Sequence, residues 1–293
     1  SGAEVRAARK TALELLLSDH LGDCIAPCQR VHPDKVDVPR VLRLVKDGRV
    51  AEAAAVLRER VEPRTVSDSP KEPRWEKACR RGQIDAPVAI DLVLRYVAGR
   101  AEGGEDTAKP QAVGTGGTVG REGTGKDSYT VAMGKLHEEE KGEFLKEADP
   151  RGRVECEGDA ELTEQQAAAE AARCLHCDCR RPESCRLRRW ASEYGAHPAA
   201  FRGPRRAFRQ DRTHGQIVYE PGKCIVCGLC VQVSAGAKEG LGLGFVGRGY
   251  DTRPAVPLGE TLAAGLGALA AECVAVCPTG ALAWKQGEEK ARR

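Results

Sequence analysis

The chain has 293 residues with 46 Lys and Arg against 43 Asp and Glu, and its net charge of +3 excludes recruitment of nucleic acid or anionic membrane by an overall field. Aromatic residues make up only 4%, whereas Cys occurs 13 times, an odd number that argues against a complete disulfide framework. We find no apolar signal-peptide core and no stretch that could span a bilayer, so we expect a reduced, cytoplasmic chain whose thiols bind metal or react.

The first hundred residues are predicted to form short helices. Apolar residues recur at helical spacing in Val5–Leu17, Val41–Val45, Val50–Val61 and Pro87–Val97. A proline-punctuated loop, Glu62–Pro73, interrupts them. Because such small helices bury little apolar surface, bound metal would help to hold them together.

The middle of the chain is predicted to contain a linker. Ala101–Lys126 is rich in glycine, Met133–Leu145 is expected to be helical and Ala148–Asp159 to be a loop. Its two glycine-rich turns lack the strand–helix context of a nucleotide-binding loop. Thr163 and Gln166 then form a capping box for a helix over Glu164–Arg173.

The C-terminal part is predicted to combine an arginine-rich helix, Leu187–Gly195, with brief strands at 217–219, 244–246 and 281–284. We therefore expect an α+β fold that is mostly helical. The expected domains are a helical domain at 1–100, a linker at 101–160 and a cysteine-rich domain at 161–293.

The most specific motif is Cys224-x2-Cys227-x2-Cys230, with Cys277-Pro278 far downstream. Such a run wraps thiolates around a [4Fe-4S] cluster, and Gly228 allows the tight curvature of the loop. Ser234 stands where a two-cluster ferredoxin has a fourth cysteine, so Cys277 is the expected fourth ligand. A zinc site is the alternative, but this spacing is poor for zinc. Cys273 is expected to be a buried thiol.

A second group of four cysteines falls within twelve residues: Cys174, Cys177, Cys179 and Cys185. Spacing alone leaves structural zinc and a second [4Fe-4S] cluster open, and His176 is an alternative ligand. Eleven arginines against four acids lie between Arg173 and Arg212. They would stabilise a reduced cluster, bind RNA together with Trp190, Phe201 and Phe208, or form a solvated face.

Four segments between residues 170 and 285 resemble, in order, the large iron–sulfur subunit of NADH:quinone oxidoreductase and the related domains of iron hydrogenases. They are Cys179-x5-Cys185 with Arg186–Gly195, Tyr219–Cys230, Gly244–Asp251 and Cys277–Leu282. The resemblance implies that Cys224, Cys227, Cys230 and Cys277 hold one [4Fe-4S] cluster. At the second cluster that family uses one His and three Cys, whereas this chain offers Cys174, Cys177, Cys179 and Cys185. We expect the upstream [2Fe-2S] domain of that family to be absent.

The N-terminal hundred residues resemble the helical iron–sulfur domain of glutamate synthase small subunits and dihydropyrimidine dehydrogenases. The shared segments are Cys24-x3-Cys28-x3-His32-Pro33, Leu42–Gly48, Glu76–Gly82 and Pro87–Ile90. His32, Lys71 and Trp75 stand where that family has cysteines of one cluster, which implies that this cluster is lost. The resemblance assigns Cys24, Cys28 and Cys79 to the other cluster. His20, four residues before Cys24, is the candidate for the fourth ligand in preference to Asp19 or Asp23, and a surface histidine at a helix end is the alternative. The two resemblances imply a helical iron–sulfur domain at 1–100 and a ferredoxin-like iron–sulfur domain with two cluster sites at 161–293. We expect the FAD and NAD(P) domains of the second family to be missing.

These features together predict a non-catalytic electron-transfer subunit of a larger cytoplasmic oxidoreductase complex, with three [4Fe-4S] clusters. Its expected partners are a flavoprotein, an NAD(P)H dehydrogenase-like subunit or a hydrogenase subunit, and neither nucleic acid nor a membrane span is expected. The alternatives are a structural zinc scaffold or an RNA-binding protein. An independent flavoenzyme would need a flavin pocket, for which we find no motif.

Overall fold

The computed structural model describes residues 2–61, 73–101, 130–155, 161–201, 203, 206–236 and 241–285. The chain divides into two compact units, and we describe each by itself. Unit 1 comprises Ser1–Cys24, Lys126–Met133 and Cys179–Arg293, and unit 2 comprises Ile25–Gly125 and Gly134–Asp178. Unit 2 is thus an insertion into unit 1. This division differs from the expected boundaries at 100 and 160, because the helical unit continues to Asp178.

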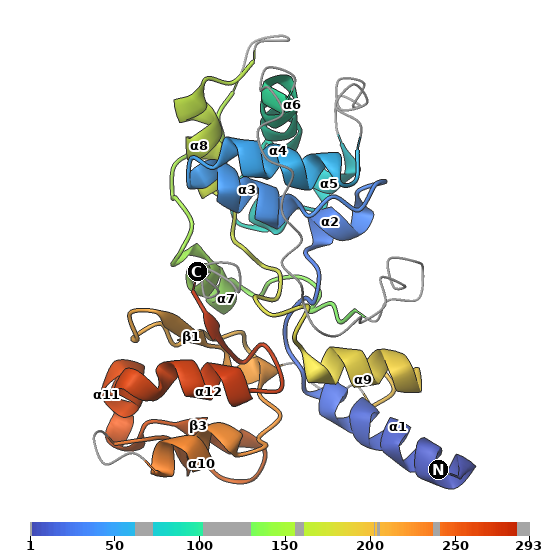
Figure 1. Cartoon of the computed structure of the whole chain (residues 1–293), viewed down its shortest axis with the longest axis vertical. Coiled ribbons are helices and arrows are strands. Elements are labelled where there is room, and N and C mark those ends of the chain that lie inside the picture. The colour runs from blue at the N-terminus through green and yellow to red at the C-terminus, as the bar shows by residue number, and fades with distance from the viewer. Residues whose placement is uncertain are drawn as a thin grey trace. The chain divides into compact units, whose positions relative to one another are not determined.

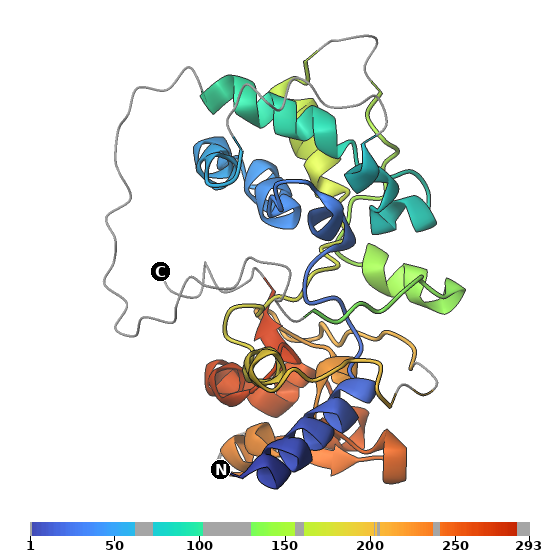
Figure 2. The same cartoon turned by 90° about the vertical axis from the view of Figure 1, so that its right-hand side faces the viewer.

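In its described part, unit 2 consists of helices and connecting loops and contains no strand. Its elements are α2 (Pro27–Val31), α3 (Val38–Lys46), α4 (Val50–Arg58), α5 (Arg74–Lys77), the 3-10 helix η2 (Arg80–Gln83), α6 (Ile90–Ala101), α7 (Glu138–Leu145) and α8 (Glu164–Ala172). Helices α3, α4 and α6 pack on one another, and α8 packs on α3 (Figure 1). The view in Figure 2 looks along α3 and α4, with α6 lying across them.

Helix α3 shows how the sequence specifies this core. The Asp37 carboxylate accepts the Arg40 N–H at 3.3 Å, and Pro39 occupies the first turn, so both signals start the helix at the observed place. Its apolar side chains are all buried: Val38, Val41, Leu42, Leu44 and Val45. The capping box at Thr163 likewise starts α8 as expected, with the Gln166 N–H donating to Thr163 Oγ1 at 3.3 Å.

A buried ion pair ties α8 to the rest of unit 2. Glu170 is fully buried and accepts the Ala89 and Val154 N–H groups, each at 2.7 Å, as well as the Arg173 guanidinium at 2.8 Å. Arg173 also donates to the Ala86 carbonyl at 2.8 Å. Since one carboxylate serves donors from three separate segments, it fixes the path of the chain around α8.

Unit 1 combines helices with two small sheets. Its helices are α1 (Ala3–Ser18), α9 (Arg186–Tyr194), α10 (Leu229–Ala235), α11 (Leu262–Leu266) and α12 (Ala270–Val276). Short 3-10 turns are η3 (Pro221–Lys223), η4 (Gly249–Asp251), η5 (Pro257–Gly259) and η6 (Gly267–Leu269). Strand β1 (Ile217–Tyr219) pairs antiparallel with β4 (Leu282–Trp284), and β2 (Gly244–Val246) with β3 (Arg253–Ala255). Thus the chain after Cys277 returns beside the strand that precedes Cys224.

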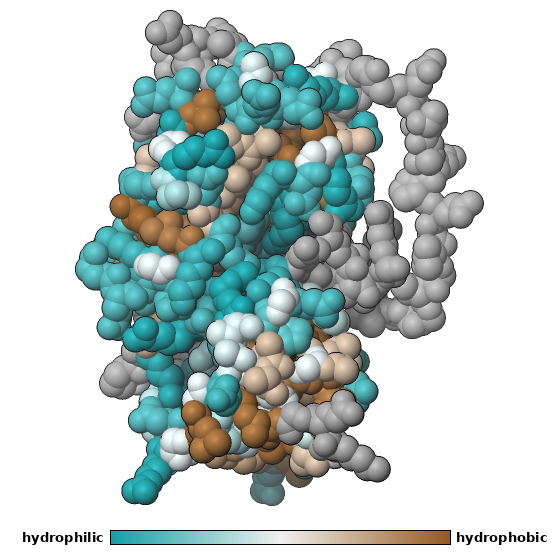
Figure 3. Space-filling view, turned by 90° about the vertical axis from the view of Figure 1, so that its left-hand side faces the viewer, coloured by the Kyte–Doolittle hydropathy of each residue, from teal (hydrophilic) through white to brown (hydrophobic). Residues whose placement is uncertain are grey.

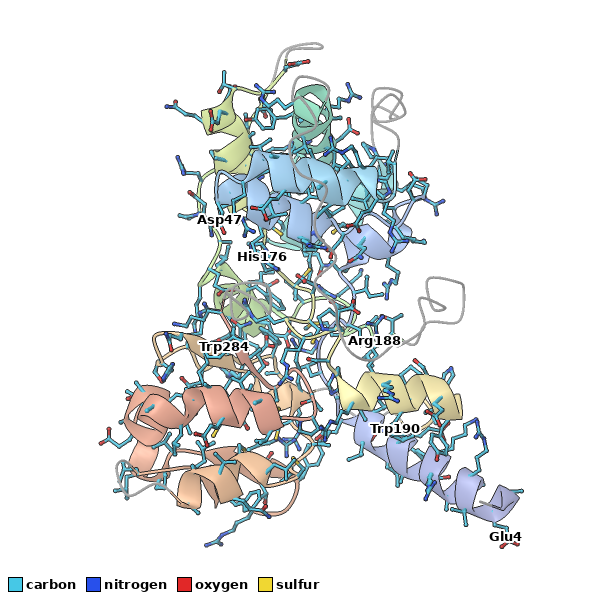
Figure 4. All side chains as sticks on the ribbon, viewed as in Figure 1. Glu4, Asp47, His176, Arg188, Trp190 and Trp284 are labelled. Carbon is cyan, nitrogen blue, oxygen red and sulfur yellow. The ribbon has the colours of Figure 1, made fainter. Side chains whose placement is uncertain are left out.

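Helices α1 and α9 lie side by side in unit 1, although 167 residues separate Ser18 from Arg186 in the sequence (Figures 1 and 4). The Arg6 guanidinium donates to the Glu193 carbonyl at 2.8 Å, and the His197 N–H donates to Glu14 at 3.0 Å. These contacts hold the N-terminal segment against the part of unit 1 that follows the insertion.

The structure confirms most of the predicted helices and strands, within a few residues. The helices α2, α5, α10, α11 and α12 and strand β3 are not among the predicted elements. The expected linker 101–126 lies almost wholly outside the described residues. On the face drawn in Figure 3, hydrophobic surface forms small separate areas among hydrophilic ones. No helix within the described ranges is long and apolar enough to cross a membrane.

Candidate metal centres

The structure brings together the four cysteines of the C-terminal motif. Cys224, Cys227, Cys230 and Cys277 all line one cavity in unit 1. Cys224 follows η3, Cys230 lies in the first turn of α10, and Cys277 ends α12. We refer to this group as the C-terminal site.

The loop of the C-terminal site curves through two left-handed residues. Val226 has φ = 55° and Gly228 has φ = 77°. The Val226 N–H donates to Cys224 Sγ at 3.3 Å, so the backbone already supplies a hydrogen bond to the sulfur. A Cβ at position 228 would lie 3.2 Å from the Phe245 ring. Glycine is therefore favoured here by its left-handed conformation, and a side chain would also crowd the Phe245 ring.

Two buried polar groups at the C-terminal site, the Cys230 thiol and the Tyr219 hydroxyl, bear on how a metal would bind there. Burial raises the pKa of Cys230 to about 12, followed by the effect of the neighbouring thiols. A metal that binds the thiolates would therefore have to displace protons. The Tyr219 hydroxyl is buried beside Cys224. In the described part of the chain it has no partner with hydrogen-bond geometry. A thiolate at Cys224 would be an acceptor for it. Cys273 is completely buried and points to the Cys230 carbonyl, as expected for a thiol outside the ligand set.

A second group of four thiols lies in unit 2. Cys28 and Cys174 belong to its apolar core, and Cys79 and Cys177 pack against that same core. Burial raises the pKa of Cys28 well above its usual value, and the three other thiols of the group raise it further. Between Cys174 and Cys177, His176 takes a left-handed conformation with φ = 45°, which turns the chain sharply. We call Cys28, Cys79, Cys174 and Cys177 the insertion site.

A third group lies in unit 1, on both sides of the insertion. The thiol of Cys24 interacts with those of Cys179 and Cys185, and burial raises its pKa to about 11. The Val131 N–H donates to Cys24 Sγ, and the Arg188 N–H at the start of α9 donates to Cys185 Sγ, both at 3.4 Å. These are the backbone-to-sulfur hydrogen bonds that a thiolate ligand would use.

His20 completes the third group. Its Nδ1 is shut off from solvent and has no hydrogen-bond partner in the described ranges. Burial, followed by the Lys223 cation, lowers the pKa of His20 to about 4, so the imidazole is neutral and available as a ligand. Lys223 also interacts with the thiol of Cys179, which places His20 and Cys179 around the same side chain. We call His20, Cys24, Cys179 and Cys185 the junction site.

This grouping of the thiols differs from the expected ligand sets, which stay predictions. The sequence prediction joined His20 and Cys24 to Cys28 and Cys79, and joined Cys174 and Cys177 to Cys179 and Cys185. In the structure each set is divided, because the chain passes from unit 1 to unit 2 after Cys24 and returns after Asp178. Each passage contributes cysteines to both units, so residues close in sequence serve different sites. The alternatives Asp19 and Asp23 are engaged elsewhere, with Arg206 and with the Met133 N–H.

Two of the positions at which the resemblance expects cysteines form an aromatic contact. His32 and Trp75 stand where the resemblance expects cysteines, and their rings pack with centroids 4.6 Å apart. Lys71, the third such position, lies outside the described residues. The ring pair is consistent with packing in place of a cluster.

Arginines of the basic segment bind backbone carbonyl groups of the chain itself. Arg181 donates to the Cys277 carbonyl at 3.1 Å and Arg188 to the Pro182 carbonyl at 3.1 Å. Of the aromatic residues considered for RNA stacking, Trp190 on α9 is 41% exposed and Phe201 is 48% exposed, whereas Phe208 is only 4% exposed (Figure 4). The described contacts therefore favour a structural role for these arginines over an RNA-binding face.

A glycine next to the junction site provides a selective test. A Cβ on Gly280 would lie 2.5 Å from Cys179 Sγ, closer than a Cβ can approach. We expect Gly280→Ala to displace this sulfur and to reduce the iron content by about four atoms, one cluster. Gly215→Ala is the matched control in unit 1, because a Cβ at position 215 meets nothing within 4 Å. Equal iron contents in the two variants would contradict this placement of Cys179.

Comparisons with known proteins give partial similarities. No family model matches the chain. Over 73 residues it is 37% identical to the NADP(+)-dependent formate dehydrogenase subunit beta of Moorella thermoacetica, which covers 25% of this chain and 10% of that protein. A chain of the NAD+-reducing [NiFe]-hydrogenase, solved in the H2-reduced state, is 32% identical over 36% of this chain and 46% of its own length, with a TM-score of 0.32. Part of the sequence is thus similar to part of a subunit of a redox enzyme.

Among the described residues, no three His, Cys, Asp or Glu side chains converge tightly enough to hold a single metal ion. The thiols of each group are nevertheless neighbours, as the shared cavity, the shared core and their mutual effects on pKa show. What the sites have in common is therefore a set of four ligand side chains rather than a preformed single-ion centre.

Proposed function

We propose that the chain is a non-catalytic electron-transfer subunit with a [4Fe-4S] cluster at the C-terminal site, the insertion site and the junction site. The observation that carries the proposal is the grouping of twelve potential ligands into three sets of four, each within one unit. Such clusters accept and donate single electrons when bound. A four-iron cluster spaces its thiolates more widely than one zinc ion does, because each thiolate binds a different iron.

The residues of this chain would ligate the clusters, exclude water and supply hydrogen bonds. Because the thiols are buried, a cluster bound to them would lie in surroundings of low dielectric constant. Backbone N–H groups donate to the sulfur atoms of Cys24, Cys185 and Cys224. Both features set the potential of a bound cluster. None of these roles requires acid–base or nucleophilic chemistry, which supports a carrier rather than a catalyst.

The junction site and the C-terminal site are neighbours within unit 1. The Leu21 N–H donates to the Gly222 carbonyl at 2.7 Å, so the segment that carries His20 and Cys24 packs against the loop that leads to Cys224. Thr279 is a second contact in this region. Its hydroxyl donates to the Lys223 carbonyl at 2.9 Å and lies 3.8 Å from Cys277 Sγ. This arrangement supports transfer of electrons between the two sites.

The partial similarity to a formate dehydrogenase subunit supports a place in a larger oxidoreductase complex. The chain spans about a tenth of that relative's length. We propose that the partners are other redox subunits, a flavoprotein, NAD(P)H dehydrogenase-like or hydrogenase subunit on one side and a further redox centre on the other.

The proposal is tested by reconstituting the full chain with iron and sulfide in the absence of oxygen. About twelve iron and twelve sulfide per chain are expected, from three clusters of four. Broad visible absorption that bleaches when dithionite is added would show that the clusters accept electrons. A colourless chain that binds zinc and retains no acid-labile sulfide would contradict the proposal and favour the zinc scaffold.

A further inference from the structure

Lys223, which immediately precedes the C-terminal motif, is buried, whereas most lysines in proteins are exposed. Lys223 is 3% exposed and pairs with Glu220, which is also 3% exposed. The Gln210 amide donates to the other oxygen of Glu220 at 2.8 Å. A buried ion pair of this kind brings little stability of its own, because both charges lose their hydration. The pair therefore calls for another explanation.

Gly22 leaves room for the end of the Lys223 side chain, and Gly280 and Gly222 lie where neighbouring segments approach closely. A Cβ on Gly22 would lie 2.7 Å from Lys223 Cε, and a Cβ on Gly280 would lie 3.9 Å from Lys223 Cδ and 2.5 Å from Cys179 Sγ. A Cβ on Gly222 would lie 2.9 Å from the Leu21 side chain. The stem of Lys223 thus runs between the segment that carries His20 and Cys24 and the sulfur of Cys179.

The charge of Lys223 faces the junction site. Its cation interacts with His20 and with the thiol of Cys179, and Arg180 is the other cation near this ion pair. The opposing charges around His20 are Glu220 and Asp19. Asp19 is already bound by Arg206 at 2.6 Å and by Arg253 at 2.7 Å. Lys223 therefore brings a fixed positive charge to this site from the loop of its neighbour.

We propose that the buried Glu220–Lys223 pair sets the reduction potential of the junction site, with the Lys223 cation raising it and the Glu220 carboxylate lowering it. The inference rests on the proposed function, because it requires a cluster at the junction site. Reduction adds one electron and one negative charge without a proton, so a nearby cation favours the reduced form and a nearby anion opposes it. The two side chains form one structural unit but must act with opposite signs.

The test is a potentiometric titration of the reconstituted full chain with dithionite, followed by electron paramagnetic resonance. The signal that disappears in Cys179→Ala identifies the junction site. Lys223→Gln is expected to shift its potential downward, on the order of tenfold in the ratio of reduced to oxidised cluster, or about 59 mV for one electron. Glu220→Gln is expected to shift it upward, and the double variant should lie between the two. Lys223→Arg, which keeps the charge, should stay near the wild-type potential.

The controls separate charge from damage to the fold. Lys10→Gln removes a lysine that pairs with Glu14 on α1, far more exposed than Lys223, and should leave the potential unchanged. If Lys223→Gln does not assemble a cluster, the upward shift in Glu220→Gln and the wild-type value in Lys223→Arg still decide the matter. Shifts of the same sign in Lys223→Gln and Glu220→Gln, or no shift in Glu220→Gln, would overturn the inference. Absence of any cluster from the wild-type chain would instead overturn the proposed function.

Discussion

Replacing Cys28 or Cys174 by Ala is expected to remove the same cluster, although 145 residues lie between them in the sequence. Both thiols belong to the core of unit 2, and each single variant should bind about eight iron instead of about twelve. The double variant should lose no more iron than either single one, because one cluster cannot be lost twice. Iron and acid-labile sulfide measured on the reconstituted chains check this.

The decisive comparison uses two cysteines that are close in sequence. Cys177 and Cys179 are separated only by Asp178, yet they belong to different units. The double variant Cys177→Ala/Cys179→Ala should therefore lose two clusters and retain about four iron. Cys273→Ala is the matched control, since this thiol is buried but lies outside the proposed ligand sets, and it should keep the full iron content. Loss of only one cluster in the double variant would restore the grouping that spacing predicts and contradict the structure.

Glu170→Ala is expected to have the largest effect on the stability of unit 2. The substitution leaves the buried Arg173 guanidinium without its closest carboxylate and deprives the Ala89 and Val154 N–H groups of their acceptor. Breaking a buried ion pair from one side costs about 3–5 kcal/mol. We expect a loss of that size in the free energy of unfolding, measured by urea denaturation and far-ultraviolet circular dichroism.

Two further variants show whether the effect comes from the buried carboxylate. Gln165→Ala lies on an exposed position of the same helix and should change the free energy of unfolding by less than about 0.5 kcal/mol. Glu170→Gln keeps one oxygen acceptor and should be less harmful than Glu170→Ala. If Glu170→Ala and Gln165→Ala unfold at the same urea concentration, the network around Arg173 does not hold unit 2 together.

The C-terminal site could be predicted from the sequence because its chemistry is local. Three of its four cysteines lie in one loop, and the glycine at position 228 has the left-handed conformation that the motif requires. Several helices of unit 2 could also be predicted, since capping residues and apolar spacing act over one or two turns, whereas α10 and α12, which hold Cys230 and lead to Cys277, could not. Thr163 and Asp37 are examples, because both cap the helices that were predicted to follow them.

The other two ligand sets could not be predicted from spacing. Cys24 and Cys179 are neighbours in unit 1, although most of unit 2 lies between them in the sequence. No local pattern shows that Cys177 and Cys179 belong to different units. The resemblances to known families indicate three sites and the cysteines of each region. Because the matching segments follow one another in the sequence, they predict separate domains in succession. The signal that was available is the family's use of one His with three Cys, which points to His20 once Cys24 is placed beside Cys179.

Charge patterning gave no hint of the role proposed for Lys223. A Glu and a Lys three residues apart usually form an exposed pair, but this pair is buried, and the glycines at 22, 222 and 280 lie where the surrounding segments approach closely. Those glycines are required where two segments distant in sequence approach closely. Their significance therefore depends on tertiary contacts that a single sequence does not reveal.

The most direct measurement is the anomalous scattering of iron in crystals of the reconstituted chain grown without oxygen. The account predicts three iron clusters, one bounded by His20, Cys24, Cys179 and Cys185, one by Cys28, Cys79, Cys174 and Cys177, and one by the cysteines of the C-terminal site. Iron held by Cys174, Cys177, Cys179 and Cys185 together, or iron absent from beside Cys24, would contradict it.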